Sequence, residues 1–266
     1  MNRLKYILLL LALFAAGCEK VIHVDLNNAN PEIVIEALLH DNENSCRVNI
    51  SETGSYFEPY NKHAVTGADI VLSDSEGHIF NFNDNGDGVY QSDSFTPVYD
   101  QLYTISVDAG GKTYQASSYL NRPVPVNSLS SEYRQGTLFF DSGYIVTCNF
   151  TDPAGTPDYY RIKISVNGQE DSSPYDYYVF KDEFFNGKTI GIPLQRQLFN
   201  PGDTVRVELL RIDEAAYDYF NTLESILGSS SAGSAAPANP VSNFSNNALG
   251  YFSAYSSSGK TIIIQK

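Results

Sequence analysis

Residues 158–166 read DYYRIKISV, and this stretch decides the fold class to which we assign the chain. The apolar side chains at every second position are Tyr160, Ile162, Ile164 and Val166. Because successive side chains of a strand point to opposite faces of a sheet, this alternation predicts a strand with one apolar face. Residues 205–210, VRVELL, repeat the pattern. We therefore expect a protein built from half-buried strands.

Similar short runs occupy most of the chain on both sides of this stretch. They are separated by turn signals such as DSEG, NDNGDG and DAGGK, whose glycines allow the positive φ angles of tight reversals. Short, closely spaced strands with such turns are typical of antiparallel sandwiches. In the strand expected at residues 32–40, Ile33, Ile35 and Ala37 share one face. The other expected strands are residues 45–52, 68–73, 77–82, 88–91, 102–108, 112–119, 126–134, 143–151, 175–182, 188–193 and 204–212, and the segments GYFSAYS and TIIIQK should close the last sheet.

Two prolines, Pro123 and Pro125, interrupt the pattern in NRPVPVN, residues 121–127. Proline has no backbone donor, so this segment suits a linker or a change of sheet. We place a domain boundary here. The predicted fold class is mainly β, with two antiparallel β-sandwich domains of the Ig-like or transthyretin-like kind, at residues 31–121 and 122–266.

The period of the apolar residues changes near the C-terminal end, in DEAAYDYFNTLESIL. The residues at helical spacing are Ala216, Phe220, Leu223 and Leu227. Asp213 is a good N-cap and Gly228 a good end, because a carboxylate accepts hydrogen bonds from the first turn and glycine adopts the left-handed conformation that often ends a helix. We predict one short helix at residues 213–227.

Residues 1–17 have the organisation of a secretory signal peptide. Arg3 and Lys5 precede an apolar run that is too short for a bilayer span of about 20 residues. The small residues of AAGC then lead to Cys18, as at the cleavage site of a bacterial lipoprotein. We expect Cys18 to carry acyl chains such as palmitate, and residues 18–30 to form a tether. The alternatives are a plain secretory signal with an incidental cysteine, or a short anchor helix.

The anchor and the charge together restrict the partners. Glu19 and Lys20 follow the cysteine in place of an aspartate that would favour the inner membrane, so we expect the outer membrane. Whether the chain lies on the periplasmic or the surface-facing leaflet stays open. The formal net charge of −14 repels nucleic acid and anionic lipid headgroups. We therefore expect no nucleic-acid partner, and a membrane contact made through the acyl chains alone.

Motifs for catalysis and for metal binding are absent from the sequence. The four histidines have no His or Cys partner at metal-ligand spacing, and no nucleophile elbow, phosphate loop or dinucleotide motif occurs. Four acidic residues gather in the second half, but the sequence gives no reason to pair two of them for glycoside hydrolysis. They are Asp171, Asp176, Asp182 and Glu183. We predict no enzyme activity, no cofactor and no metal.

Residues 83–90, NDNGDGVY, invite comparison with a calcium loop. Asn83, Asn85 and Asp87 stand at the first, third and fifth places, but Ser94 stands where an EF-hand loop needs a bidentate glutamate. A polar hairpin turn is the favoured interpretation.

Cys46 and Cys148 each fall on the apolar face of a predicted strand. An oxidising envelope permits a disulfide between them. Two separate buried thiols fit their expected placement in different domains. Both alternatives stay open.

Tyrosines are concentrated in EDSSPYDYYVF and DEAAYDYF. A tyrosine offers an apolar ring together with a hydroxyl, so such clusters suit recognition surfaces, although alternating tyrosines in a strand are usually divided between core and surface. The candidate binding patch comprises Tyr175, Tyr177, Tyr178, Tyr217 and Tyr219.

Several longer stretches are similar to the Bacteroidota lipoproteins grouped as domain of unknown function 4249. They are CEKVIHVDL, PEIVIEALL, TDPAGTPDYYRIKI, FFNGKTIGIPL, PGDTVRVELLRIDEAAYDYFNTL and NPVSNFSNNALGYFSAYS, which together cover nearly the whole chain after Cys18. The resemblance implies an outer-membrane lipoprotein with β-sandwich domains. It also implies an accessory role in uptake, because such genes often lie beside TonB-dependent receptors. No catalytic residue transfers from this family.

Taken together, these observations predict a non-enzymatic envelope lipoprotein. We expect it to be an accessory, ligand-binding or partner-binding component of a TonB-dependent outer-membrane uptake system. One alternative is a structural or adhesive surface subunit of the fimbrillin kind, since those subunits are also lipoproteins built from tandem sandwiches. Another is a hydrolase whose site no motif reveals.

Overall fold

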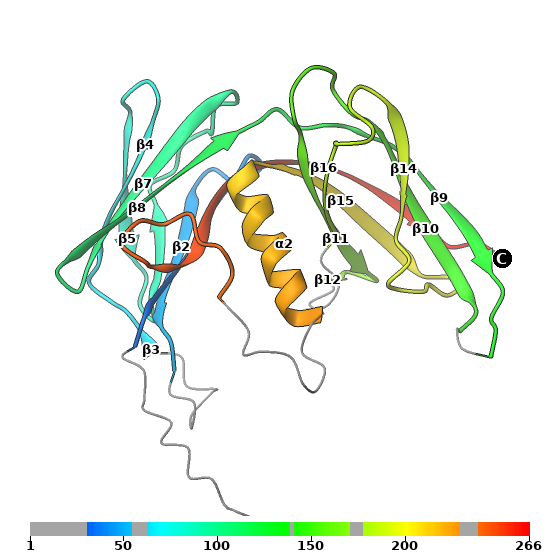
Figure 1. Cartoon of the computed structure of the whole chain (residues 1–266), viewed down its shortest axis with the longest axis horizontal. Helices are drawn as coiled ribbons and strands as arrows, with labels where there is room; N and C mark the ends of the chain where they lie inside the picture. The colour runs from blue at the N-terminus through cyan, green and yellow to red at the C-terminus, as the bar shows by residue number, and fades with distance from the viewer. Residues whose placement is uncertain (1–30, 55–62, 139–140, 171–177, 229–238) are drawn as a thin grey trace, which may run out of the picture. The chain divides into compact units, whose positions relative to one another are not determined.

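The computed structural model describes residues 31–54, 63–138, 141–170, 178–228 and 239–266 (Figure 1). Within it, Pro31–Lys266 form one compact unit. The predicted signal peptide, Cys18 and the tether lie outside the described residues. No helix in the described ranges is long and apolar enough to cross a membrane.

The first half of the described chain consists of short antiparallel strands, as predicted. Ile35 and Ala37, expected on the apolar face of their strand, are fully buried. The NDNGDG segment is a hairpin turn in which the Asp84 carboxylate accepts the Gly86 N–H at 2.8 Å, so the turn interpretation is confirmed. The strands are β1 (Ile33–His40), β2 (Cys46–Glu52), β3 (His63–Ala64), β4 (Asp69–Asp74), β5 (Ile79–Asp84), β6 (Val89–Ser92), β7 (Gln101–Ala109) and β8 (Lys112–Leu120).

The second half contains further strands and one helix. DYYRIKISV forms most of a strand in which Tyr160, Ile162 and Ile164 are buried, which confirms the predicted face. The elements are β9 (Val126–Arg134), β10 (Gly143–Thr151), β11 (Tyr159–Val166), β12 (Gln169–Glu170), β13 (Tyr178–Lys181), β14 (Thr189–Pro193), β15 (Thr204–Ile212), α2 (Glu214–Gly228) and β16 (Leu249–Ile263).

Helix α2 begins where the capping pattern predicted. The Asp213 carboxylate accepts the Ala216 N–H at 2.9 Å, and its other oxygen accepts the Tyr119 N–H at 3.1 Å. Asp213 therefore caps the helix and ties it to β8. The side of α2 that carries Ala216 and Phe220 is buried against the large sheet, next to β11, β15 and β16 (Figure 1).

Two separate sandwich domains, which the sequence predicted, are not the observed arrangement. Strands from both halves share one mixed sheet of 13 strands, and β9, β10 and β14 form a second sheet of three. The strand common to both halves is β16. Its first part pairs in parallel with β1, and its second part pairs antiparallel with β15.

Gly250 permits the parallel pairing of β1 and β16. Its φ is +96°, and a Cβ at this position would lie 2.0 Å from the carbonyl oxygen of Ile35. Only glycine combines this backbone conformation with so close an approach.

Each half has its own hydrophobic core, and β16 contributes to both. Phe252 and Ala254 of β16 pack in the first core, with β1, β2 and β4 to β8. In the second core the three-stranded sheet packs on β11 and β15, and Ile262 of β16 packs against them. The C-terminal strand, predicted to belong wholly to the second domain, therefore completes the first.

Cys46 and Cys148, the two cysteines within the described ranges, are separate buried thiols. Cys46 lies in the first core and Cys148 in the second, and neither forms a disulfide. Burial raises the pKa of Cys46 and raises that of Cys148 to about 12, so both are unreactive thiols.

Candidate functional site

The structure divides the predicted tyrosine patch. Tyr178 lies in the second core with only 8% of its surface exposed, because it pairs with Ile162 and points to the same side. Tyr217 and Tyr219 are half-buried on α2 and pack on the outer face of the large sheet. Tyr175 and Tyr177 lie outside the described residues.

The two helix tyrosines join aromatic residues that the sequence did not single out. Tyr217 lies 5.2 Å from Tyr159, and Tyr219 lies 4.5 Å from Tyr251, between ring centroids. The periodic spacing of apolar residues in a strand or a helix predicts which face a residue occupies. It does not predict which other element covers that face. The signal that would have found Tyr251 and Tyr255 is their alternation in GYFSAYS.

Beside α2, the outer face of the large sheet carries two adjoining hollows of about 180 and 170 Å³. Both are lined by Lys163, Leu210 and Tyr255, and we call them together the seam groove. Its walls come from β1, β11, β15, β16 and α2, so it lies where the strands of the two halves join.

Aromatic and charged groups alternate along the seam groove. Tyr255 stacks on the His40 ring at 4.7 Å, and the Arg161 guanidinium lies 4.1 Å from the Phe220 ring. Lys163 forms an ion pair with Glu170. Burial raises the pKa of Tyr255, so its hydroxyl stays protonated and offers a hydrogen bond.

A serine and a histidine meet at one end of the groove. His40 Nε2 lies 2.8 Å from Ser257 Oγ, and Asn42 donates to the same hydroxyl at 3.1 Å. Such a pair is the first requirement of a serine nucleophile. However, Glu43 lies 3.8 Å from His40 Nδ1, which is longer than a hydrogen bond, so the histidine lacks an aligned carboxylate on that side.

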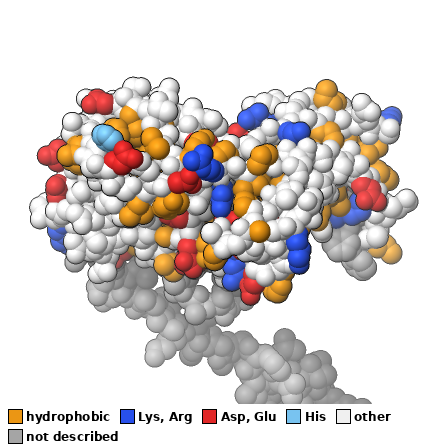
Figure 2. Space-filling view, turned by 90° about the horizontal axis from the view of Figure 1, so that it is seen from above, with side chains coloured by type: hydrophobic (Ala, Val, Ile, Leu, Met, Phe, Trp, Pro, Cys, Tyr) orange, Lys and Arg blue, Asp and Glu red, His pale blue; other side chains and the backbone are white. Residues whose placement is uncertain are grey.

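The face of the protein drawn in Figure 2 carries charges of both signs. Figure 2 shows acidic and basic side chains interspersed, with hydrophobic side chains in small groups between them. A hollow of about 370 Å³ lies on the three-stranded sheet, lined among others by Tyr133, Arg134 and Pro193.

Three aspartates form a second candidate site, inside the protein. Asp152 follows β10, Asp158 precedes β11 and Asp182 follows β13. Because β11 and β13 pair antiparallel, Asp158 and Asp182 are adjacent, and the Asp182 N–H donates to the Asp158 carbonyl at 3.0 Å. Asp152 reaches them from the opposing three-stranded sheet.

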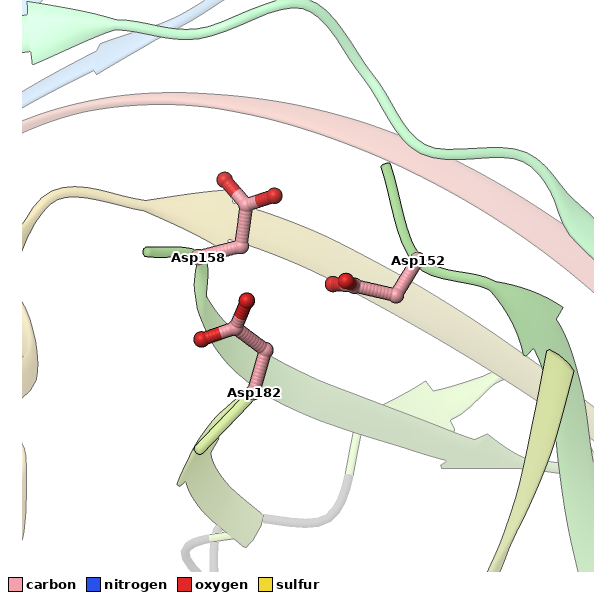
Figure 3. Close-up of side chains that lie close together, drawn as sticks. All are labelled: Asp152, Asp158 and Asp182. Atoms are coloured by element: carbon pink, nitrogen blue, oxygen red, sulfur yellow. The ribbon is translucent and has the colours of Figure 1, made fainter. Parts of the chain in front are cut away.

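The three carboxylates are close together and buried. Their exposed fractions are 2%, 3% and 4%, and one oxygen of each lies within 4.8 Å of the others. Figure 3 shows the carboxylate of Asp152 pointing toward the other two.

The hydrogen bonds of this aspartate cluster leave two oxygens without partners. Asp152 accepts the Tyr160 hydroxyl at 2.6 Å and the Gly187 N–H at 2.8 Å. One oxygen of Asp158 accepts hydrogen bonds from Arg211, including Nε at 3.0 Å. Oδ2 of Asp158 and Oδ2 of Asp182 have no hydrogen-bond partner within the described part of the chain.

The charges of the cluster are incompletely balanced. Arg211 supplies one positive charge beside three carboxylates. Burial raises the pKa of Asp158; the neighbouring Arg211 opposes this, and the charges of Asp152 and Asp182 add to it. A buried group of this kind holds a proton or a cation, because uncompensated buried charge is very unfavourable.

Sequence reasoning missed this cluster. It named Asp182, but together with Asp171 and Asp176, which lie outside the described residues, and with Glu183, which instead pairs with Lys181 at 2.9 Å. Asp152 and Asp158 were not singled out. No spacing in the sequence signals the cluster, since its members come from three strand ends that meet only in the fold.

Comparison with known proteins places the chain in a family. The model of the family described as Domain of unknown function (DUF4249) matches residues 19–261. No curated protein matches the chain. Because the matched residues make up most of the sequence, the chain belongs to the DUF4249 family.

Proposed function

We propose that this chain is a lipid-anchored envelope protein without enzyme activity, held at the outer membrane through Cys18. In this proposal it acts as an accessory of a TonB-dependent receptor and binds a protein partner or a ligand. Support comes from the signal-like residues 1–17, from the order of the family-like stretches and from the seam groove.

The seam groove is the observation that carries the binding role. It combines Tyr251 and Tyr255 with Arg161, and tyrosine and arginine are among the residue types that dominate binding energy at protein interfaces. Pockets that enclose a small molecule have volumes of about 300 to 1,000 Å³. Each hollow of the groove is smaller, at about 180 and 170 Å³, and therefore suits a side chain of a partner better than a whole ligand.

A pull-down from detergent-solubilised outer membrane tests the proposal. Wild-type chain is expected to capture a TonB-dependent receptor. Lys163→Glu should weaken capture, because it replaces a groove cation and breaks the ion pair with Glu170. Lys112→Glu, which makes the same charge change at an exposed hairpin end, is the matched control and should bind as wild type.

Two results would contradict the proposal. The first is that wild-type chain captures no receptor while a deletion strain keeps normal uptake. The second is that Lys112→Glu and Lys163→Glu reduce capture equally, because the loss would then follow net charge and not the groove.

A hydrolase remains the second candidate function, favoured by the contact between Ser257 and His40 in the groove. A fluorophosphonate probe, which reacts with activated serines, tests it directly. A hydrolase would be labelled in the wild-type form and lose labelling in Ser257→Ala. Ser128→Ala, at an exposed serine of β9, is the control and should keep the label. Unlabelled wild-type chain would favour the non-enzymatic proposal.

A further inference from the structure

We infer that Asp152, Asp158 and Asp182 together bind one calcium ion in the second half of the protein. The inference is independent of the proposed function, because the seam groove and its partner play no part in it. Within the described ranges, these three residues, and not the acidic NDNGDG turn, form the group in which carboxylates converge below the surface.

The charges of the three aspartates favour a bound cation. Three carboxylates lie in a region where none is more than 4% exposed, and Arg211 forms an ion pair with one of them, Asp158. If all three carboxylates are ionised, the single positive charge of the Arg211 guanidinium leaves two negative charges uncompensated. A divalent cation would restore neutrality without placing protons on groups that are ionised at neutral pH in water.

The spacing of the carboxylate oxygens suits one ion. Calcium binds oxygen at about 2.3 to 2.6 Å, so two of its ligands lie at most about 5 Å apart. The selected oxygens of the three aspartates lie within 4.8 Å of one another and satisfy this limit. One ion placed among the three oxygens would therefore need only small side-chain shifts to contact one oxygen of each residue.

The hydrogen bonding of the carboxylate oxygens also favours a cation. Oδ2 of Asp158 and Oδ2 of Asp182 are buried and accept no hydrogen bond from the described residues. Buried polar atoms are rarely left unpaired in folded proteins, and each such case calls for a partner. Two unpaired carboxylate oxygens beside a third carboxylate indicate that the missing partner is a cation.

The donor set selects the kind of cation. All three side chains offer oxygen, and none offers the nitrogen or sulfur that zinc and copper favour. Calcium accepts irregular sets of six to eight oxygens, whereas magnesium requires a nearly ideal octahedron. Ligands from three different strand ends fit the more permissive ion.

The ion would connect the two layers of the second core. Asp152 ends a strand of the three-stranded sheet, whereas Asp158 and Asp182 flank strands of the large sheet. A shared ligand would therefore hold the sheets together at this edge and raise the stability of the folded chain.

Thermal unfolding of the purified full chain tests the inference, with EDTA, calcium or magnesium added. With calcium at about 100 times its Kd, the midpoint should rise by about 5 to 10 °C. Asp182→Asn should unfold at the same temperature with and without calcium. Asp87→Asn, in the exposed NDNGDG turn, makes the same chemical change and should keep the full calcium response.

Terbium luminescence provides a second readout that needs no variant. Tyr160 donates a hydrogen bond to Asp152, so its ring lies close enough to sensitise a terbium ion in the cluster. Excitation of tyrosine should therefore produce terbium emission that calcium displaces. The inference is overturned if wild-type chain shows neither a calcium-dependent thermal midpoint nor terbium emission that calcium displaces. It is also overturned if Asp182→Asn keeps the rise in midpoint with calcium or if Asp87→Asn loses it. A larger rise with magnesium than with calcium would likewise overturn it.

Discussion

Replacing Phe252 with alanine tests whether β16 unites the two cores. Phe252 is fully buried in the first core, and the other end of its strand pairs with β15 beside the second core. Removing a buried phenylalanine ring costs about 3 to 5 kcal/mol of stability. For a compact unit of this size each kcal/mol lowers the midpoint by about 2 to 4 °C, so we expect a decrease between about 6 and 20 °C.

Phe150→Ala is the matched variant in the second core. Phe150 is also fully buried, and its ring lies 5.1 Å from that of Tyr160. If the shared strand couples the cores, both variants should lower the midpoint of one common transition. Differential scanning calorimetry, with the calorimetric and van't Hoff enthalpies compared, is the assay, because their equality marks a single cooperative unit.

Independent folding of the halves would give a different result. Wild-type chain would unfold in two transitions, and each variant would move one of them and leave the other in place. That outcome would refute the conclusion that β16 makes the halves one cooperative structure.

Three further predictions address the anchor, the helix and an ion pair. Cys18→Ala should leave protein that is unprocessed or released from the membrane, as detected by fractionation and mass spectrometry; normal acylation of this variant would contradict the anchor. Asp213→Ala should lower the free energy of unfolding by about 0.5 to 2 kcal/mol in denaturant titrations, because the N-cap of α2 is lost; an unchanged midpoint would contradict the capping role. His78 lies 2.8 Å from Asp74, whose hydrogen bond and charge raise the pKa of the histidine. Its contribution is therefore fully present below the unfolded pKa of about 6.5 and is lost as pH rises through the folded value. Thermal midpoints of wild type and His78→Ala should differ most near pH 5.5 and converge by pH 8.5, and a gap that widens with pH would show the reverse sign.

Local patterns predicted the elements well, because their causes are local. Alternation in DYYRIKISV identified β11 and its buried face, since the period of side chains in a strand depends only on backbone geometry. Likewise Asp213 and the helical spacing after it predicted α2 to within one residue at each end. These signals require no knowledge of which element lies nearby.

The shared strand could not be predicted in the same way. Ser256 to Gly259 interrupt the apolar pattern, so GYFSAYS and the later TIIIQK were expected to be separate segments. In the structure the strand continues through them, because the backbone of Ser256 to Ser258 pairs with Leu209 to Arg211 of β15. Ser258 donates to the Val124 carbonyl at 2.6 Å and accepts the Val126 N–H at 2.9 Å. These bonds link β16 to residues 121–127, the proline segment that the sequence indicates as a domain boundary.

The candidate sites depend on contacts of the same long-range kind. The seam groove requires β16 to lie between β1 and β15, and the aspartate cluster requires three strand ends to meet. Composition reveals many carboxylates and many tyrosines, but the fold decides which few converge. Tyr178 illustrates the point, because its place in the tyrosine-rich segment suggested a surface and its register placed it in a core.

Strand β11 connects the two sites without merging them. Arg161 and Lys163 line the seam groove on its outer face, whereas Tyr160 points into the second core and Asp158 stands at its start. An ion at Asp158 would therefore steady the strand that carries the groove cations without touching a partner bound there. Because a rigid strand loses little freedom on binding, the groove is suited to recognition with a small ordering cost. Asp182→Asn should therefore affect partner capture only in proportion to the loss of folded chain. Lys163→Glu, which also breaks the ion pair with Glu170, should lower capture by more than any loss of folded chain explains. Measuring capture and stability for both variants separates the two proposals.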